Sequence, residues 1–297
     1  RKLAEEGKSP DLGTKIKLAI ADRLVFSKIR EKFGGKLEAS LSSSAAISSD
    51  VAHFFHDVGL PVFEAWGMTE LSPAGTLNTP ESYKVGSAGK AIDKVKLVID
   101  TSVVEEGAKD GELIVYGPNV MQGYHNKPDA TKATMTEDGG LRTGDRAYID
   151  DDGFLYITGR IKEQFKLDNG KFVFPATIEE QIKLLPEVEH AMVFGMNKPF
   201  TVCLVVPDFE ILDVWAKKEG LPTDHVKLVA ESKVQNLFES KIKKMLQGSF
   251  GSYEIPKKFI VLSEPFSTEN GILTPTLKLK RRKVVERYGD QIESLYG

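Results

Sequence analysis

The chain has 297 residues with a formal net charge of -3, and 41% of its residues are hydrophobic and 28% charged. This length favours two domains, the composition is that of an ordinary globular protein, and the charge argues against a general nucleic-acid binder. The only cysteine, Cys203, lies in an apolar run, which excludes an intramolecular disulfide, suits a reducing compartment and indicates a packing role.

The first predicted elements are a helix, a strand and a second helix. Apolar residues recur at helical spacing from Lys15 to Phe33, and Gly34-Gly35 follows as a stop. Leu37 to Leu41 alternates as a strand, and a serine-rich stretch then leads into a helix that Ser49 or Asp50 can cap. Taken alone, the serine-rich stretch is the cap region of that helix.

A short buried strand, Pro61 to Ala65, runs into the pentapeptide Trp66-Gly67-Met68-Thr69-Glu70. These residue types suit a nucleotide site: a ring can stack on a base, a glycine permits a tight turn, a hydroxyl contacts phosphate and a carboxylate holds Mg²⁺. Alone, the pentapeptide is better explained as a loop with a capping threonine and a solvated glutamate. Its interpretation therefore depends on the rest of the chain.

Short strands separated by glycine and proline follow from Lys84 to Tyr124 and predict a small antiparallel sheet or barrel. Two turns come next: Thr143-Gly144-Asp145, which leaves a carboxylate projecting, and the hairpin turn Asp151-Asp152-Gly153. The apolar pattern ends at Arg160 and becomes polar. We place a domain boundary directly after this point, between residues 161 and 162.

Beyond this boundary the pattern predicts a compact α+β domain. Its predicted elements are a helix from Ala176 to Leu185, hairpin strands at His190–Gly195 and Thr201–Val206, helices at Phe209–Glu219 and Val226–Leu246, a strand at Lys258–Leu262 and a closing helix at Lys283–Leu295. The basic run Leu273 to Lys283, between the last two elements, is by itself typical of a solvated surface.

Four separated motifs, taken together, resemble the adenylate-forming, AMP-binding enzymes, and among them the long-chain fatty acid CoA ligases (acyl-CoA synthetases). They are Trp66 to Glu70, Gly111 to Leu113 with Gly117 to Tyr124, Thr143 to Arg160 with the glycine loop after it, and Leu273 to Arg281. The resemblance covers the chain from about Gly35 onward. Because the family's Ser/Thr/Gly-rich phosphate loop lies upstream of the matched region, the resemblance implies the C-terminal part of a longer synthetase.

The fold implied by this resemblance is mixed, α/β and α+β. Residues 1–161 would form the C-terminal part of the large AMP-binding domain, built of sheet and helix layers with a small β-barrel. Residues 162–297 would form the small, mobile C-terminal domain of the family. The two halves are therefore expected to contribute different parts of one site.

The reaction implied by the resemblance is the ATP-dependent activation of a long-chain fatty acid. The carboxylate attacks the α-phosphate of ATP to give acyl-AMP and pyrophosphate, and the thiol of coenzyme A then displaces AMP. The resemblance makes Lys278 the catalytic lysine that bridges carboxylate and α-phosphate, with Lys280 as runner-up. It also assigns phosphate binding to Thr69 and Mg²⁺ binding to Glu70.

The nucleotide side of the site is expected to include the residues Ser44, Ala45, Glu64, Trp66 and Gly67. Ala46 stands where the family usually has proline, which weakens the detailed contact with adenine but not its location. Asp145 would accept both ribose hydroxyls and Arg160 would steady the ribose. The assignments of Ser44, Ala45, Glu64, Asp145 and Arg160 come from the resemblance alone, whereas the residue types of Trp66 and Gly67 also suit such a site by themselves.

For the second step, the family rotates its small domain about a hinge residue, which corresponds here to Lys162. The loop around Gly170 would then line the path of the coenzyme A pantetheine arm, and glycine suits a backbone that a ligand must pass closely. Asn169-Gly170 is in any case expected to be a hairpin turn, and Lys166 is either a site residue or a solvated strand residue.

Two alternatives to this function stay open at the level of sequence. One is an acyl-AMP ligase that loads a carrier protein, and the other is a non-catalytic nucleotide-binding module. The expected partners are fatty acid, ATP and coenzyme A, with no nucleic acid. We expect a cytoplasmic protein, with peripheral contact at a membrane as an alternative because fatty substrates partition into membranes.

Overall fold

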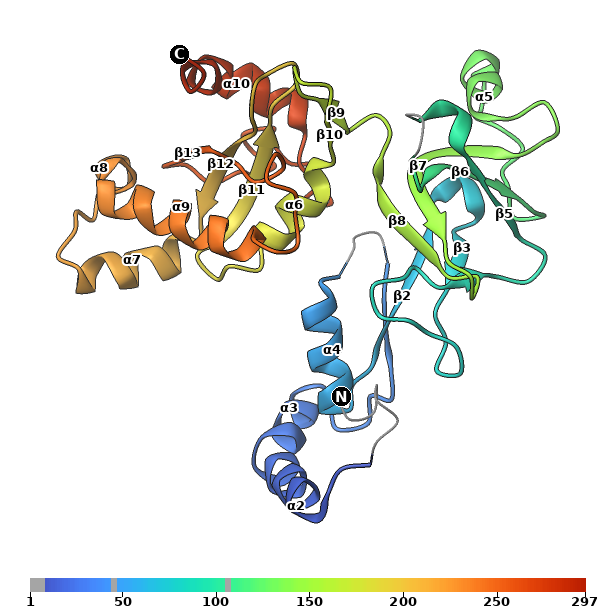
Figure 1. Cartoon of the computed structure of the whole chain (residues 1–297), viewed down its shortest axis with the longest axis horizontal. Helices are drawn as coiled ribbons and strands as arrows, with labels where there is room; N and C mark the ends of the chain where they lie inside the picture. Colours follow the sequence, from blue (N-terminus) through green and yellow to red (C-terminus); the bar gives the residue numbers. More distant parts are fainter. Residues whose placement is uncertain (1–8, 44–46, 105–107) are drawn as a thin grey trace. The chain divides into compact units, whose positions relative to one another are not determined.

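The structure is a computed structural model of the chain and describes residues 9–43, 47–104 and 108–297. Internal contacts divide it into two units, which meet in the chain between Thr158 and Gly159 (Figure 1). This division falls close to the domain boundary predicted between residues 161 and 162, which stays a prediction. Each unit is described below by itself.

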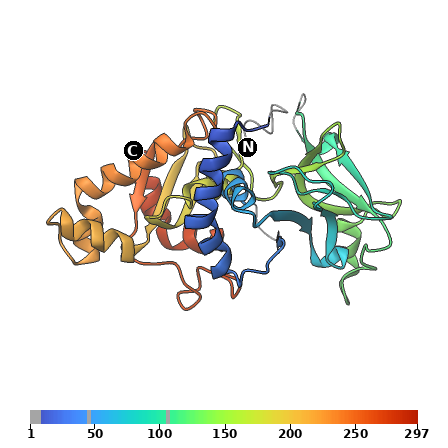
Figure 2. The same cartoon turned by 90° about the horizontal axis from the view of Figure 1, so that it is seen from below.

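The first unit begins with a helical segment that runs without interruption from Leu12 to Lys32. It contains the α-helices α2 (Leu12–Ala21) and α3 (Ser27–Lys32), and the π-helical turn Asp22–Phe26 joins them into one continuous helix (Figure 2). The helix ends where Gly34 and Gly35 adopt positive φ angles of 84° and 69°, which only glycine adopts without strain. The predicted helix and its glycine stop are therefore confirmed.

A four-stranded sheet in the order β1-β2-β3-β4 follows. Its strands, with the helix α4 between the first two, are β1 (Ser40–Ser42), α4 (Ser49–Val58), β2 (Val62–Gly67), β3 (Ala74–Leu77) and β4 (Lys90–Ala91). Strands β1 and β2 are parallel, so α4 is their crossover connection, and the remaining pairs are antiparallel. The cap of α4 is Ser48, not the predicted Ser49 or Asp50, and its side chain makes no capping hydrogen bond.

A second four-stranded sheet completes the unit, in the order β5-β6-β7-β8. Its elements are β5 (Lys96–Asp100), the 3-10 turn Thr101–Val103, β6 (Gly111–Tyr116), α5 (Pro128–Thr134), β7 (Leu141–Ile149) and β8 (Leu155–Arg160). Among the described residues the sheet is open, because no strand pairs β5 with β8. The expectation of a closed barrel is therefore wrong, and the alternative of a small sheet holds.

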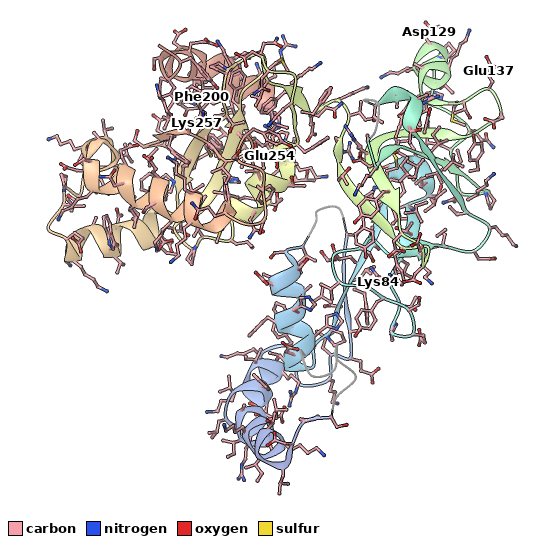
Figure 3. The ribbon with its side chains drawn as sticks, in the orientation of Figure 1. Lys84, Asp129, Glu137, Phe200, Glu254 and Lys257 are labelled. Carbon is pink, nitrogen blue, oxygen red and sulfur yellow. The ribbon has the colours of Figure 1, made fainter. Side chains whose placement is uncertain are left out.

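The predicted Asp-Gly hairpin lies between β7 and β8, where Gly153 has a φ of 86° and its N–H donates to Asp150 O at 2.9 Å. The Lys84 side chain, labelled in Figure 3, secures this turn through ion pairs of 2.6 Å to Asp150 and 2.5 Å to Asp152. These two hydrogen bonds raise the pKa of the Lys84 ammonium above its usual range. The loop that precedes β4 is thereby tied to the tip of the β7–β8 hairpin.

The second unit is an α+β layer structure. Its elements are β9 (Phe165–Lys166), β10 (Phe172–Val173), α6 (Pro175–Ile182), β11 (Val188–Phe194), β12 (Val202–Pro207), α7 (Phe209–Lys218), α8 (His225–Ala230), α9 (Ser232–Leu246), β13 (Lys258–Val261) and α10 (Arg281–Ser294). Strands β9 and β10 form a hairpin, and the central sheet has the order β11-β12-β13, antiparallel and then parallel. The predicted helix over Val226–Leu246 is two helices, broken at Glu231, whose ψ of 131° is extended.

Alternate residues of the central sheet enter two separate apolar cores. On one face Val193, Cys203 and Val205 pack under α6, α7, α8 and α9. On the other face Met192 and Leu204 pack under α10. Because both faces of the sheet are covered, its middle strand β12 is buried along its whole length. Cys203 is fully buried, which confirms its packing role, and burial raises the pKa of its thiol.

Among the helices that the structure describes, none combines the length and the apolar character needed to cross a bilayer.

Candidate functional site

In the first unit, two predicted site residues that are 79 positions apart are joined directly. The Trp66 indole Nε1 donates a hydrogen bond of 2.8 Å to Asp145 Oδ2. Trp66 is the second-last residue of β2 and Asp145 is in β7, so this bond connects the two sheets of the unit. The residue Asp145 is only 2% exposed, and a buried carboxylate needs such donors to stay charged.

The backbone around Asp145 is a bulge and not the predicted turn. Thr143, Gly144 and Asp145 all lie within β7, where Gly144 has a φ of 69° and the pairing with β6 shifts register. The Thr143 hydroxyl closes the bulge, because it donates to Leu113 O at 2.8 Å and accepts from the Asp145 N–H at 3.0 Å. A bulge aims a side chain out of the regular alternation of a strand, and here it turns Asp145 towards Trp66.

Gly67 is required by a close approach of backbone and not by the tight turn that the sequence suggested. It is the last residue of β2, and a Cβ atom there would lie 1.9 Å from Pro73 O and 2.9 Å from the Ala74 Cα. Gly75 of β3 permits a different close approach, that of the indole, since a Cβ there would lie 2.6 Å from the Trp66 ring. Gly67 therefore lets β2 pass close to the Pro73–Ala74 backbone, and Gly75 leaves room for the Trp66 ring.

Glu70 is held by the segment between β6 and α5, to which the sequence assigned no functional role. The Tyr124 hydroxyl donates to Glu70 Oε1 at 2.7 Å, and the Met121 N–H donates to Glu70 O at 2.8 Å. The hydrogen bond to Glu70 raises the pKa of Tyr124, which keeps the phenol protonated as a donor. Thr69, the neighbour of Glu70, begins a 3-10 turn and is exposed.

Glu64 lies earlier on β2 and connects two loops. Its Oε1 accepts from the Gly86 N–H at 3.2 Å and its Oε2 from the Ile47 N–H at 3.5 Å. Burial raises the pKa of the Glu64 carboxyl. Ile47 follows the predicted residues Ser44 and Ala45, which lie outside the described residues.

In the second unit, Lys278 is on an exposed turn that closes on its own backbone. Thr274 makes both closing bonds: its N–H donates to Lys278 O at 2.8 Å, and its Oγ1 accepts from the Lys278 N–H at 2.9 Å. Leu277 has a φ of 60°, and a β-bridge between Leu273 and Leu279 closes the base. Within residues 159–297, all of which the structure describes, the Lys278 ammonium makes no ion pair.

The remaining predicted residues of the second unit lie near its N-terminal end. Arg160 ends β8 and is exposed, and Lys162 is exposed in the turn directly after it. Gly170 is in the hairpin turn between β9 and β10, as expected, with a φ of 87°. Lys166 is an exposed strand residue whose ammonium lies 5.4 Å from the centre of the Phe172 ring.

The structure thus brings Trp66 and Asp145 together, and Glu64 and Glu70 lie on either side of Trp66 in the chain. Lys278, Gly170 and Lys162 belong to the second unit. Sequence reasoning missed Tyr124 as a partner of Glu70. The signal was present in the Gly123-Tyr124 pair that ends the Gly117 to Tyr124 motif, but a pair of residues 54 positions apart has no local pattern.

Comparison with known proteins gives a consistent result over almost the whole chain. A family model described as "AMP-binding enzyme" matches residues 11–125, and one described as "AMP-binding enzyme C-terminal domain" matches residues 162–297. The chain is 34% identical over 297 residues to the long-chain-fatty-acid–CoA ligase FadD15 of Mycobacterium bovis, an alignment that covers 97% of this chain and 47% of the relative. The chain therefore spans about half the length of this relative.

Two solved structures have a similar fold. One is the A domain of a carboxylic acid reductase from Segniliparus rugosus, in complex with AMP and a co-purified carboxylic acid, with a TM-score of 0.73 and 25% identity over 99% of this chain and 44% of that one. The other is the O-succinylbenzoate coenzyme A synthetase of Bacillus subtilis, in complex with ATP and magnesium ion, with a TM-score of 0.62 and 26% identity over 82% of this chain and 45% of that one.

Proposed function

We propose that this chain, which belongs to the AMP-binding enzyme family, is part of a ligase that activates a fatty acid with ATP and transfers the acyl group to coenzyme A. The relative FadD15 is named a long-chain-fatty-acid–CoA ligase, and the fatty substrate of this proposal rests on that likeness. The observation that carries the proposal is the pair of Trp66 and Asp145, with Glu70 four residues after the indole.

The first unit supplies a place for the nucleotide. A nucleoside monophosphate has an aromatic base and two adjacent ribose hydroxyls, and both groups need partners of fixed orientation. The Trp66 indole offers a flat ring, and its N–H fixes Asp145 Oδ2 at 2.8 Å. Asp145 then accepts the ribose hydroxyls in the proposed complex, because a carboxylate has about four acceptor positions. Binding the nucleotide by its hydroxyls leaves the phosphates accessible for reaction.

The residues also fit the proposed magnesium ion. Mg²⁺ binds through one or two carboxylates together with substrate phosphates and water, so a cluster of acidic ligands is not needed. The described residues contain no cluster of three or more His, Cys, Asp or Glu side chains that could hold a metal. Glu70 is half-buried and has its Oε1 fixed by Tyr124, which leaves Oε2 as a single hard ligand. When bound, the ion would neutralise phosphate charge.

In the proposed first step, a carboxylate oxygen of the acid forms a bond to the α-phosphorus while the bond to the bridging oxygen of pyrophosphate breaks. The nucleophile and the α-phosphate are both negative, so the barrier is largely electrostatic. Lys278 would bring its ammonium between them. The exposed position of Lys278 on a closed turn suits a charge that must reach a substrate bound elsewhere.

In the proposed second step, the thiolate sulfur of coenzyme A attacks the acyl carbonyl and AMP leaves with the bonding electron pair. Lys278 is not needed for this step in the proposal, because the acyl–phosphate bond is a reactive mixed anhydride whose phosphate is a good leaving group. The Gly170 turn would line the thiol path, and Lys162 would be the hinge for the change of position. Both residues are exposed in turns, where backbone rotation meets little packing resistance.

The test is AMP release with Mg-ATP, coenzyme A and a series of acids from acetate to oleate, measured on this chain and on the natural full-length protein that contains it. We expect AMP release from the full-length protein to require both coenzyme A and a long-chain acid. Acid-dependent pyrophosphate release without any effect of coenzyme A would favour an acceptor carrier protein.

A second measurement separates binding from catalysis. AMP should bind to the full-length protein with an affinity that falls when Asp145 is replaced by Ala. Nucleotide binding without turnover of any acid would contradict the ligase proposal and favour a non-catalytic module. Absence of nucleotide binding by a folded protein would contradict both.

A further inference from the structure

The turn that holds Lys278 is fastened to the second unit at its base. Ile272 and Leu273 are almost fully buried in the apolar core under α10, and the Lys280 N–H donates to Ile272 O at 2.8 Å. Directly after Lys280, the chain enters α10 at Arg281. The contacts at the two ends of the exposed turn, Ile272–Leu273 and Arg281, therefore set its orientation. Arg281 is the closer of the two ends to Lys278 in the chain.

Arg281 is held by a buried carboxylate from a distant part of the chain. Its Nη2 makes an ion pair with Glu179 Oε2 of α6, and its Nη1 donates to Val193 O of β11 at 3.4 Å. The other Glu179 oxygen, Oε1, accepts from the Val193 N–H at 2.6 Å. One carboxylate thus connects α6, β11 and the start of α10, across 102 positions of sequence.

Stability alone is a poor reason for this arrangement. The attraction within a buried ion pair offsets little of the free-energy cost of removing both charges from water. Well-packed apolar residues often replace such a pair without loss of stability. Glu179 is 7% exposed, and burial raises its pKa although Arg281 opposes that shift. Arg281 does not stabilise α10 as a helix either, because it adds to two other cations, Arg282 and Lys283, at the positive end of the helix dipole, where the first turn has no acidic residue.

We propose that the Glu179–Arg281 ion pair is a positioning device that fixes the Lys278 turn for acyl-AMP formation. The inference rests on the proposed function, in which Lys278 bridges the carboxylate and the α-phosphate. Arg281 touches no substrate in this proposal and acts through the backbone that joins it to Lys278. Glu179 anchors Arg281 to the central sheet, because one of its oxygens accepts a hydrogen bond from β11 and the other pairs with Arg281.

Removing Arg281 alone would leave a buried charge on Glu179, so the informative variant changes both residues. Glu179→Gln with Arg281→Met leaves no uncompensated charge, and the amide oxygen that the first substitution introduces can still accept from the Val193 N–H. Arg281→Lys is the conservative variant, which keeps the cation and loses the second donor to Val193 O. The matched control is Glu264→Gln with Arg287→Met, because this pair also joins α10 to another segment but lies six residues beyond Arg281.

The two half-reactions are measured separately on the full-length protein. We expect the Glu179→Gln/Arg281→Met variant to lose about tenfold to a hundredfold in acyl-AMP formation, since small misplacements of a reacting group cost up to about that factor. Thioester formation from supplied acyl-AMP should stay near the unsubstituted rate, Arg281→Lys should recover most of the loss, and the Glu264/Arg287 control should show none. Equal loss in both half-reactions would overturn the proposal in favour of a structural role.

A double-mutant cycle with Lys278→Ala gives the sharper result. If the pair acts only through Lys278, its removal should cost nothing further once Lys278 is gone. If the combined variant forms acyl-AMP more slowly than Lys278→Ala alone, by the factor that the pair substitution causes by itself, the proposal is overturned. If Lys278→Ala itself leaves acyl-AMP formation unchanged, the proposed function of Lys278 is wrong, which this experiment separates from a failure of the pair.

Hydrogen exchange provides a readout that does not depend on activity. The Lys280 amide donates to Ile272 O at the base of the turn, so its exchange reports how firmly that base is held. The Glu179→Gln/Arg281→Met variant should exchange faster at Lys280, while amides in the middle of α10 keep their rates. Unchanged exchange at Lys280 would contradict the positioning role even if activity falls.

Discussion

The two units hold their proposed functional groups in opposite ways. In the first unit the side chains are fixed by other side chains: Trp66 holds Asp145, and Tyr124 holds Glu70. In the second unit the backbone around Lys278 is fixed, by Thr274 and by the pairing of Leu273 with Leu279, while the ammonium extends into solvent. The first unit thus holds its proposed site residues through side-chain hydrogen bonds, and the second presents the exposed Lys278 ammonium from a turn with a hydrogen-bonded backbone.

This difference matches the different tasks that we propose for the units. A nucleotide has fixed rings and hydroxyls, so a site for it gains affinity from groups that are ordered before binding. A charge that takes part in one of two steps must be able to leave, and an exposed lysine on its flexible four-carbon stem is easily displaced. Substitutions in the two units should therefore differ in which kinetic constant they change.

The largest effect is expected from Lys278→Ala. Loss of a preorganised charge at the reacting atoms should reduce acyl-AMP formation by about a hundredfold to a thousandfold, with little change in the KM for ATP. The measurement is pyrophosphate release on the full-length protein, with thioester formation from supplied acyl-AMP as the second readout. Lys280→Ala is the control, because Lys280 lies two residues further on. A larger loss from Lys280→Ala would transfer the assignment to that lysine.

Trp66→Phe tests the pre-formed character of the first unit. The ring stays aromatic, but Asp145 loses the indole N–H at 2.8 Å, and a hydrogen bond to a charged group is worth about 1.5–3 kcal/mol. The KM for ATP should rise by about tenfold to a hundredfold, with a smaller change in kcat.

Trp215→Phe is the matched control for Trp66→Phe, because the other tryptophan packs against the core of the second unit. The same variant leaves Trp66 as the only indole of this chain, so its fluorescence can be followed during ATP titration. An unchanged KM in Trp66→Phe would show that Asp145 needs no donor from the indole.

Gly170→Trp tests the proposed role of the second unit in the second step, thioester formation. Gly170 has a φ of 87° and only Lys166 Cε, at 3.6 Å, near a hypothetical Cβ, so space is available but any side chain is strained. Thioester formation should fall by about tenfold, equivalent to about 1.4 kcal/mol, while acyl-AMP formation is kept. Gly220→Trp is the control for strain and bulk, because Gly220 has a φ of 66° and nothing within 4 Å of a Cβ. Normal thioester formation in Gly170→Trp would contradict a role in the thiol path.

Much of the fold was predictable because its signals are local. The glycine stop at Gly34, the hairpin turn at Gly153 and the turn at Gly170 all follow from residues that tolerate positive φ. The break at Glu231 was not predictable, because no glycine or proline marks it and both flanking helices have apolar residues at helical spacing. Closure of a barrel was not predictable either, since it depends on whether the two edge strands meet.

The candidate site was predictable as a set of motifs and not as a set of contacts. The Thr143-Gly144-Asp145 sequence correctly marked a special backbone, but a bulge and a turn use the same residue types, and only the pairing with β6 distinguishes them. The contacts of Trp66 with Asp145, Tyr124 with Glu70 and Arg281 with Glu179 join residues 79, 54 and 102 positions apart. Side-chain hydrogen bonds over such separations leave no period in a single sequence.

The smallest effect is expected from Tyr124→Phe, which removes only the phenol that donates to Glu70 at 2.7 Å. A hydrogen bond of this kind is worth about 0.5–1.5 kcal/mol, or more where the acceptor is charged, so the Mg²⁺ concentration for half-maximal activity should rise by a few-fold to about tenfold. At saturating Mg²⁺ the rate should return to that of the unsubstituted protein, because the Glu70 carboxylate itself remains.

Tyr116→Phe is the matched control for Tyr124→Phe, since the Tyr116 hydroxyl also donates to a carboxylate, Asp138, at 3.0 Å, but both residues lie outside the candidate site. If Tyr124→Phe lowers the rate at saturating Mg²⁺ and leaves the Mg²⁺ requirement unchanged, then the phenol supports the fold around β6 and does not orient a magnesium ligand. In that case only the bond of Trp66 to Asp145 would support a pre-formed site in the first unit. The difference between the first unit and the Lys278 turn would then hold only for the residues proposed to bind the ribose.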